Sequence, residues 1–92
     1  MTITKCQEVI TIYKNKNSDG SLNICGSKIA IIRKNMKPKV SQRAFADMLQ
    51  LNGLDLDKNA IQRIEAGKRF VTDIELKIIA DVLNVSADIL LK

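Results

Sequence analysis

The sequence has no histidine and no tryptophan, and it has only two cysteines among 92 residues. Four-ligand zinc sites are built from cysteine and histidine, so Cys6 and Cys25 alone cannot form one within a single chain. Catalytic dyads and triads that depend on histidine are excluded as well. We expect both thiols to be reduced, as is usual in the cytosol. The sequence therefore predicts no metal site and no cofactor.

Long apolar runs are also missing, and aromatic residues are scarce. No stretch approaches the roughly 20 apolar residues of a membrane-spanning helix. The first residues do not resemble a secretory signal. The only aromatic residues are Tyr13, Phe45 and Phe70, so a core must consist mainly of Ile, Leu, Val and Ala. We expect a cytoplasmic protein with one modest core and no contact with membranes.

Groups of residues typical of enzymes are lacking too. There is no glycine-rich phosphate loop, and no pair of carboxylates is placed as a cleft would require. Asp55 and Asp57 lie two residues apart, but the first is better explained as a turn residue and the second as a helix cap. We therefore expect no enzymatic activity.

What the sequence does contain is an uneven distribution of charge around a net charge of +5. Residues 28–43 include six basic side chains and no acidic one, whereas four acidic residues outnumber two basic ones in residues 71–92. One part of the chain therefore suits a polyanion such as nucleic acid, and the other does not.

Residues 25–92 repeat one pattern that marks helix starts. An apolar residue precedes a capping residue, and a second apolar residue follows four positions after the cap. The capping residues in these four segments are Ser41, Asp57, Thr72 and Ser86. The pattern predicts an all-α fold, a compact bundle of about five short helices, with residues 25–92 as its domain.

Other signals complete the expected helices. Ser27 is the candidate cap of the first one, which ends before Pro38 because the residue before a proline avoids the helical conformation. Gly67 ends the helix that begins at Asp57. Thr72 and Glu75 have the spacing of a capping box.

Residues 1–24 form an N-terminal extension whose structure the sequence leaves open. Ile3, Cys6, Ile10 and Tyr13 fit a helical stripe, but residues 9–13 also fit a strand, because all are β-branched or aromatic. The extension is a dimerisation arm, a DNA-contacting arm or a disordered segment. We favour a short ordered element used in self-association.

The outward face of the helix expected at residues 57–66 carries only hydrogen-bonding side chains without a carboxylate. They are Lys58, Asn59, Gln62 and Arg63. Arg and Lys can donate to guanine, and Asn and Gln can pair with adenine in the major groove. A solvated helix face without a partner explains the same residues equally well.

Three segments in order resemble the helix-turn-helix domains of the Xre/Cro/CI family, which have a lambda-repressor-like fold. These segments are SQRAFADMLQ (41–50), AIQRIEAGKR (60–69) and IELKIIADVLNVSADIL (74–90). The resemblance implies a helix-turn-helix protein whose second helix, residues 57–66, enters the major groove of double-stranded DNA. Lys58, Asn59, Gln62 and Arg63 would then contact bases.

The resemblance also implies roles for residues outside that helix. It implies phosphate contacts for Gln42, Lys68 and Arg69, and the DNA-binding hypothesis adds Lys28 and Arg43 to this set. The helix N-terminus at Gln42 and Arg43 also favours a phosphate. The resemblance further implies a structural ion pair between Arg33 and Glu65, which ties the first helix of the domain to the base-contacting one.

The sequence departs from the family in the turn between the two helices. Residues 50–56 make this connection about five residues longer than in the commonest members, with a break at Asn52-Gly53. Leu51, Leu54 and Leu56 are expected to pack against the domain. The longer turn affects how the second helix is angled into the groove.

Two functions follow from these observations. The first is a sequence-specific transcriptional regulator, a repressor that acts as a homodimer on paired half-sites. The alternative is an antitoxin-like protein-interaction module that also binds its own promoter and holds a toxin-like protein partner.

Overall fold

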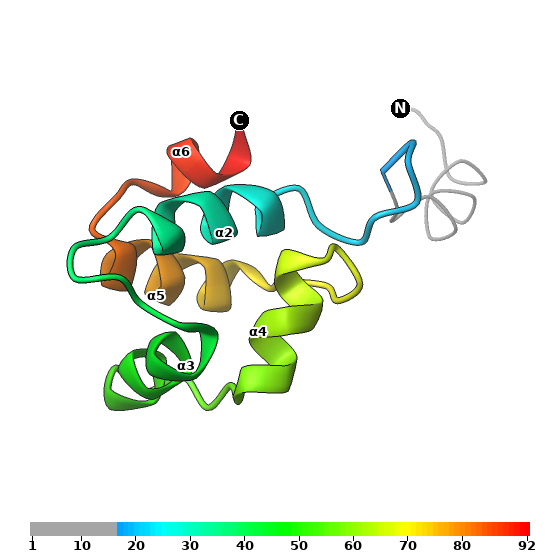
Figure 1. Cartoon of the computed structure of the whole chain (residues 1–92). Helices are drawn as coiled ribbons and strands as arrows, with labels where there is room; N and C mark the ends of the chain where they lie inside the picture. Colours follow the sequence, from blue (N-terminus) through cyan, green and yellow to red (C-terminus); the bar gives the residue numbers. More distant parts are fainter. Residues whose placement is uncertain (1–16) are drawn as a thin grey trace.

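The computed structural model describes residues 17–92, so the predictions about residues 1–16 lie outside it. Within the described range the chain forms five α-helices and no strand (Figure 1). They are α2 (Gly26–Lys34), α3 (Gln42–Leu51), α4 (Lys58–Glu65), α5 (Asp73–Leu83) and α6 (Ala87–Leu91). The predicted all-α bundle of about five short helices is confirmed.

The five helices surround one core of aliphatic side chains and a single phenylalanine. Their main contacts follow a ring in which α2 lies against α4, α4 against α3, α3 against α5, α5 against α6, and α6 against α2. The largest fully buried side chains are Phe45, Ile29, Leu49, Ile61, Ile64, Ile79 and Leu90. Every helix supplies at least one of them, so no helix can be removed without opening the core.

Side-chain caps begin three of these helices where the sequence predicts them. The Ser41 hydroxyl accepts a hydrogen bond from the Ala44 amide at 3.0 Å, and the Asp57 carboxylate accepts one from the Ala60 amide at 2.8 Å. Thr72 and Glu75 form the complete capping box. Because each cap satisfies amides of the first turn that have no partner in the helix, these residues fix where α3, α4 and α5 begin.

The other two predicted caps are not formed. α2 begins at Gly26 instead of after Ser27, and the oxygen that accepts from the Gly26 amide belongs to the side chain of Asn23. Ser86 occupies the capping position of α6, but its side chain makes no capping hydrogen bond. Asn23, three residues before α2, thus supplies the acceptor that was expected from Ser27.

Leu51, which is expected to pack against the domain, is exposed, and so is the apolar Ile74 in α5. α3 continues to Leu51, which is 88% exposed, whereas Leu54 and Leu56 in the same connection are buried as predicted. Ile74 is 70% exposed. It lies five residues before the buried Ile79, which places it roughly 140° away around α5 at 3.6 residues per turn.

α2 and α4 approach each other closely at one point. Gly26 is buried at the start of α2, and a Cβ atom there would collide with the carbonyl oxygen of Ile64 in α4. Only glycine allows this contact. The end of α4 is therefore held directly against the start of α2, which sets the position of α4 in the bundle.

None of the helices within residues 17–92 combines the length and the apolar composition needed to cross a bilayer.

Candidate nucleic-acid interface

α4 presents two chemically different faces. Ala60, Ile61 and Ile64 are buried in the core. The four side chains on the opposite face, Lys58, Asn59, Gln62 and Arg63, are all exposed, as their spacing in the sequence predicts. The exposed face offers two cations and two carboxamides, which are the groups that bind base edges in the major groove.

The exposed face of α4 continues into neighbouring segments through two shallow hollows. Asn59, Gln62 and Arg63 line one hollow together with Lys68 from the loop after α4. Lys58 and Asn59 line a second hollow with Arg43 from α3. Asn59 belongs to both, so a single surface runs from Arg43 across α4 to Lys68. We call these six residues the α4 surface.

The second hollow also contains two carboxylates, of which Asp57 was expected only as a helix cap and Asp47 was not expected to take part. Asp47 and Asp57 line it beside Arg43 and Lys58. Asp57 already accepts from the Ala60 amide, and Asp47 is exposed on α3. Carboxylates can accept from the amino group of cytosine. This end of the α4 surface therefore offers acceptors as well as donors.

A buried ion pair lies behind the α4 surface. The Arg33 guanidinium donates to both oxygens of the Glu65 carboxylate, at 2.7 and 2.9 Å, and each side chain is only 7% exposed. Arg33 also donates to the Val40 carbonyl at 2.9 Å. A two-pronged pair of this kind fixes the relative orientation of its partners, and here it joins α2 to the C-terminal end of α4.

Gln42 takes part in the same network. Its side-chain amide donates to a Glu65 oxygen at 2.9 Å, so the first residue of α3 is fixed against α4. One N–H of this amide is used in the contact, and the second can still meet a phosphate. Lys28, by contrast, is half-buried on α2 and lines neither hollow of the α4 surface.

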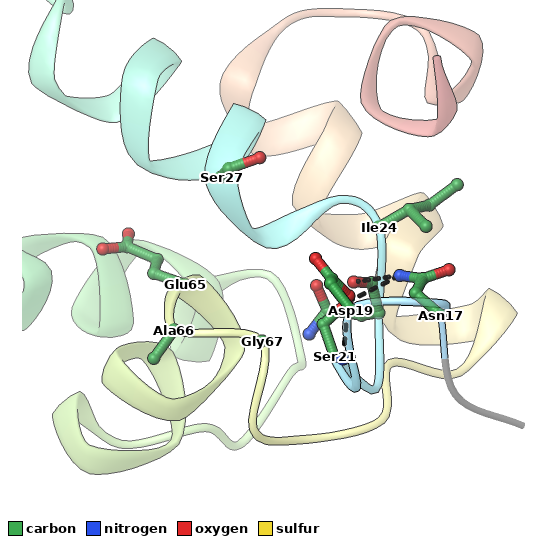
Figure 2. A pocket seen from close by; sticks show the side chains of 9 residues that line it. Asn17, Asp19, Ser21, Ile24, Ser27, Glu65, Ala66 and Gly67 are labelled. Atoms are coloured by element: carbon green, nitrogen blue, oxygen red, sulfur yellow. Dashed lines mark hydrogen bonds between the residues drawn. The ribbon is translucent and has the colours of Figure 1, made fainter.

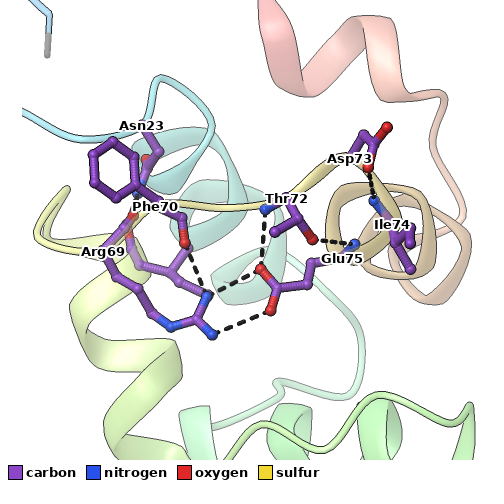
Figure 3. Close-up of polar contacts among 8 residues, drawn as sticks. Asn23, Arg69, Phe70, Thr72, Asp73, Ile74 and Glu75 are labelled. Carbon is purple, nitrogen blue, oxygen red and sulfur yellow. Dashed lines mark hydrogen bonds and ion pairs between the residues drawn. The ribbon is translucent and has the colours of Figure 1, made fainter. Parts of the chain in front are cut away.

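Arg69 is engaged differently from what the resemblance implies. Its guanidinium donates to both Glu75 oxygens at 3.1 Å and to the Phe70 carbonyl at 2.9 Å (Figure 3). These hydrogen bonds from Arg69 lower the pKa of the Glu75 carboxyl below its ordinary value of 4.5. The Arg69–Glu75 pair ties the loop after α4 to α5. Because Glu75 neutralises the charge of Arg69, we assign no phosphate contact to Arg69.

Asn23 is a structural residue that the sequence analysis missed. Its side chain contacts the start of α2, the end of α4 and the loop after α4. Residues 17–21 form a turn beside it that lines a hollow with Glu65, Ala66 and Gly67 (Figure 2). Asp19-Gly20 is a recognisable turn signal, but no local pattern relates Asn23 to partners 41 and 46 positions further along the chain.

Residues 17–92 show neither a metal-binding cluster nor a reactive thiol. Within residues 17–92 no three side chains of His, Cys, Asp or Glu gather where a metal ion could be held. Cys25 is free and buried, and burial raises the pKa of its thiol, which disfavours the reactive thiolate.

Comparison with known proteins gives one match. The model of a family described as helix-turn-helix matches residues 29–90, which include all of α3, α4 and α5. No curated protein and no solved structure matches the chain.

Removing one member of the buried ion pair should destabilise the fold strongly. Glu65→Gln leaves the Arg33 charge buried without its partner, and we expect a loss of about 3 kcal/mol in the free energy of unfolding. The measurement is urea denaturation. Asp81→Asn is the matched control, because it removes the same charge from the exposed Lys77–Asp81 pair, whose atoms are 3.5 Å apart.

The control should lose less than about 1 kcal/mol, because exposed pairs contribute little. A double variant, Arg33→Met with Glu65→Leu, should recover most of the loss, since two apolar residues leave no buried charge. Equal losses for Glu65→Gln and Asp81→Asn would contradict the structural role of the pair.

The Arg69–Glu75 pair should make stability depend on pH in the acidic range. Because the folded pKa of Glu75 is depressed, its contribution is present above the unfolded value of about 4.5 and is lost as the pH falls through the folded pKa. We expect wild type to lose more stability between pH 6 and pH 3 than Glu75→Gln does. Urea denaturation at several pH values measures both, and parallel curves for the two proteins would count against this prediction.

Proposed function

Because the chain belongs to the helix-turn-helix family of DNA-binding regulators, we propose that it binds double-stranded DNA sequence-specifically by inserting α4 into the major groove. The observation that carries this proposal is the α4 surface. Lys58, Asn59, Gln62 and Arg63 extend from a helix whose opposite face is locked into the core. The backbone positions that carry these side chains are therefore rigidly held, which is what selection among base pairs requires.

We assign the flanking residues of the surface to phosphate contacts. Arg43 and Lys68 are exposed at its two ends, where the DNA backbones on either side of a major groove would pass. Gln42 can add an N–H near the start of α3. We assign Lys28 to phosphate contact as well, because of its charge alone. Such contacts fix the position of the protein on the duplex but do not select a sequence.

We further propose that the protein is a cytoplasmic repressor that acts as a homodimer. One α4 can contact only a few base pairs, and two copies on inverted half-sites about one helical turn apart double the selected sequence. An apolar hollow away from the α4 surface supports self-association, because Ile24 and Leu91 line it while being 48% and 46% exposed. Binding over a promoter would block transcription without a separate effector domain.

Variants of the α4 surface test the proposal. A binding site is first selected from a pool of random duplexes, and affinity is then measured for this site and for a scrambled duplex. Arg63→Ala should reduce the discrimination between them by roughly 1–3 kcal/mol. Lys68→Ala should weaken binding to both about equally and lower the slope of the log–log salt dependence by about 1.

Lys77→Ala is the charge-matched control, because Lys77 is exposed on α5 and lines neither hollow of the α4 surface. It should leave discrimination unchanged. The selected site also reports on assembly, since a homodimer should select two inverted half-sites. Equal, sequence-independent losses for Arg63→Ala and Lys68→Ala would rule out base contact by α4.

A further inference from the structure

Residues 17–24 precede the segment that matches the family model, yet they are bonded to the end of α4. The Leu22 amide donates to the Gly67 carbonyl at 2.8 Å. The Asn23 side chain donates to the carbonyls of Ile64 at 3.1 Å and Arg69 at 2.7 Å. Its oxygen accepts from the Gly26 amide at 2.8 Å. One side chain therefore joins three segments.

The orientation of the Asn23 amide follows from its partners. Two carbonyl oxygens lie on one side and an N–H on the other, so a flipped amide would set oxygen against oxygen and N–H against N–H. Both N–H bonds of Asn23 are used. The Ile64 carbonyl lies in the last turn of α4, where carbonyls have no amide four residues further along the helix to accept from. It accepts from the Gly67 amide at 3.0 Å, and Asn23 supplies a second donor.

Further contacts hold Asn23 itself in place. The Asn17 side chain donates to the Asn23 carbonyl at 3.1 Å and to the Ser21 hydroxyl at 2.7 Å. Asp19 accepts from the amide and the hydroxyl of Ser21, and these bonds lower the pKa of its carboxyl. The turn of residues 17–21 is thus closed by its own side chains (Figure 2).

The groups that Asn23 holds are next to the DNA-contacting residues proposed above. Ile64 follows Arg63 directly, and Lys68 lies between the two loop carbonyls of Gly67 and Arg69 that accept from Leu22 and Asn23. The Lys68 amide in turn donates to the Arg63 carbonyl at 2.8 Å. A shift of this loop would therefore move Arg63 and Lys68 together.

We propose that Asn23 is a positioning residue that sets the C-terminal end of α4, and with it Arg63 and Lys68, for contact with DNA. This inference rests on the proposed function. It makes residues 17–24 a functional part of the DNA-binding unit. These residues lie before residue 25, where the sequence predicts the start of the domain, and before the family match at residues 29–90.

The test compares Asn23→Ala with Asn35→Ala in the full chain. Asn35 is exposed at the end of α2, and its side chain makes no hydrogen bond within residues 17–92. Binding to the selected duplex and to a scrambled duplex is measured well below the melting temperature of each protein. Asn23→Ala should lower the ratio of the two affinities about tenfold, the loss typical of one base pair, while Asn35→Ala leaves it unchanged.

Two further variants bracket Asn23→Ala. The milder one, Asn17→Ala, keeps the test decisive if Asn23→Ala does not fold. Asn17→Ala removes the support behind Asn23 and should lower the ratio in the same direction by a smaller factor. Asn23→Asp keeps the acceptor for the Gly26 amide but sets a carboxylate against two carbonyls, so it should lower the ratio at least as much as Asn23→Ala. An unchanged ratio in folded variants, or an equal loss of affinity for both duplexes, would overturn the positioning role.

Amide hydrogen exchange of the free protein separates this proposal from the proposed function. In Asn23→Ala, the amides of residues 64–69 should exchange faster while those of α3 keep their rates. If the wild-type protein bound the selected and the scrambled duplex equally, the proposed function would be overturned, and with it the claim that Asn23 positions residues for DNA contact. Exchange at residues 64–69 that matches wild type would overturn the claim that Asn23 holds the end of α4.

Discussion

The Arg33–Glu65 ion pair is the interaction on which the rest of the arrangement depends. It joins α2 to α4 through two hydrogen bonds, and Gln42 adds α3 to the same carboxylate. The Val40 carbonyl brings in the connection between α2 and α3. Apolar packing is non-directional, so it can hold helices together without fixing their rotation. A buried, two-pronged pair has one geometry, and we propose that it fixes how α4 faces outward.

Three contacts converge on the C-terminal half of α4. The ion pair holds Glu65, Gly26 permits the close approach to Ile64, and Asn23 bonds to the Ile64 carbonyl. The N-terminal end of α4 is fixed by its Asp57 cap. Both ends of the helix are therefore held from behind, while Lys58, Asn59, Gln62 and Arg63 remain exposed. This division of roles explains how a helix of eight residues can present a defined surface.

Much of the fold could be predicted from the sequence because its signals are local. Caps at Ser41, Asp57 and Thr72 act on amides three residues away, and Gly67 is in the left-handed conformation, with φ of 75°, that a helix end favours. The face of α4 followed from helical spacing. The Arg33–Glu65 pair, 32 residues apart in sequence, was available only through the family resemblance.

What could not be predicted depends on contacts and helix rotations that local patterns do not encode. Nothing near Asn23 indicates that its side-chain amide donates to the carbonyls of residues 64 and 69. Nothing near Arg69 shows that its guanidinium pairs with Glu75, because contact with solvent explains the same sequence equally well. Leu51 and Ile74 are apolar but exposed, because the length of α3 and the rotation of α5 decide which residues face the core.

The central claim is that α4 gives sequence-specific binding on top of a general attraction to phosphates. It is tested most directly by titrating the wild-type protein across a salt series, with the selected duplex and with a scrambled duplex of equal length. We expect tighter binding to the selected duplex at every salt concentration and a steep log–log salt slope for both. Equal affinities would contradict sequence-specific binding, and no binding to either duplex at low salt would favour the protein-interaction alternative instead.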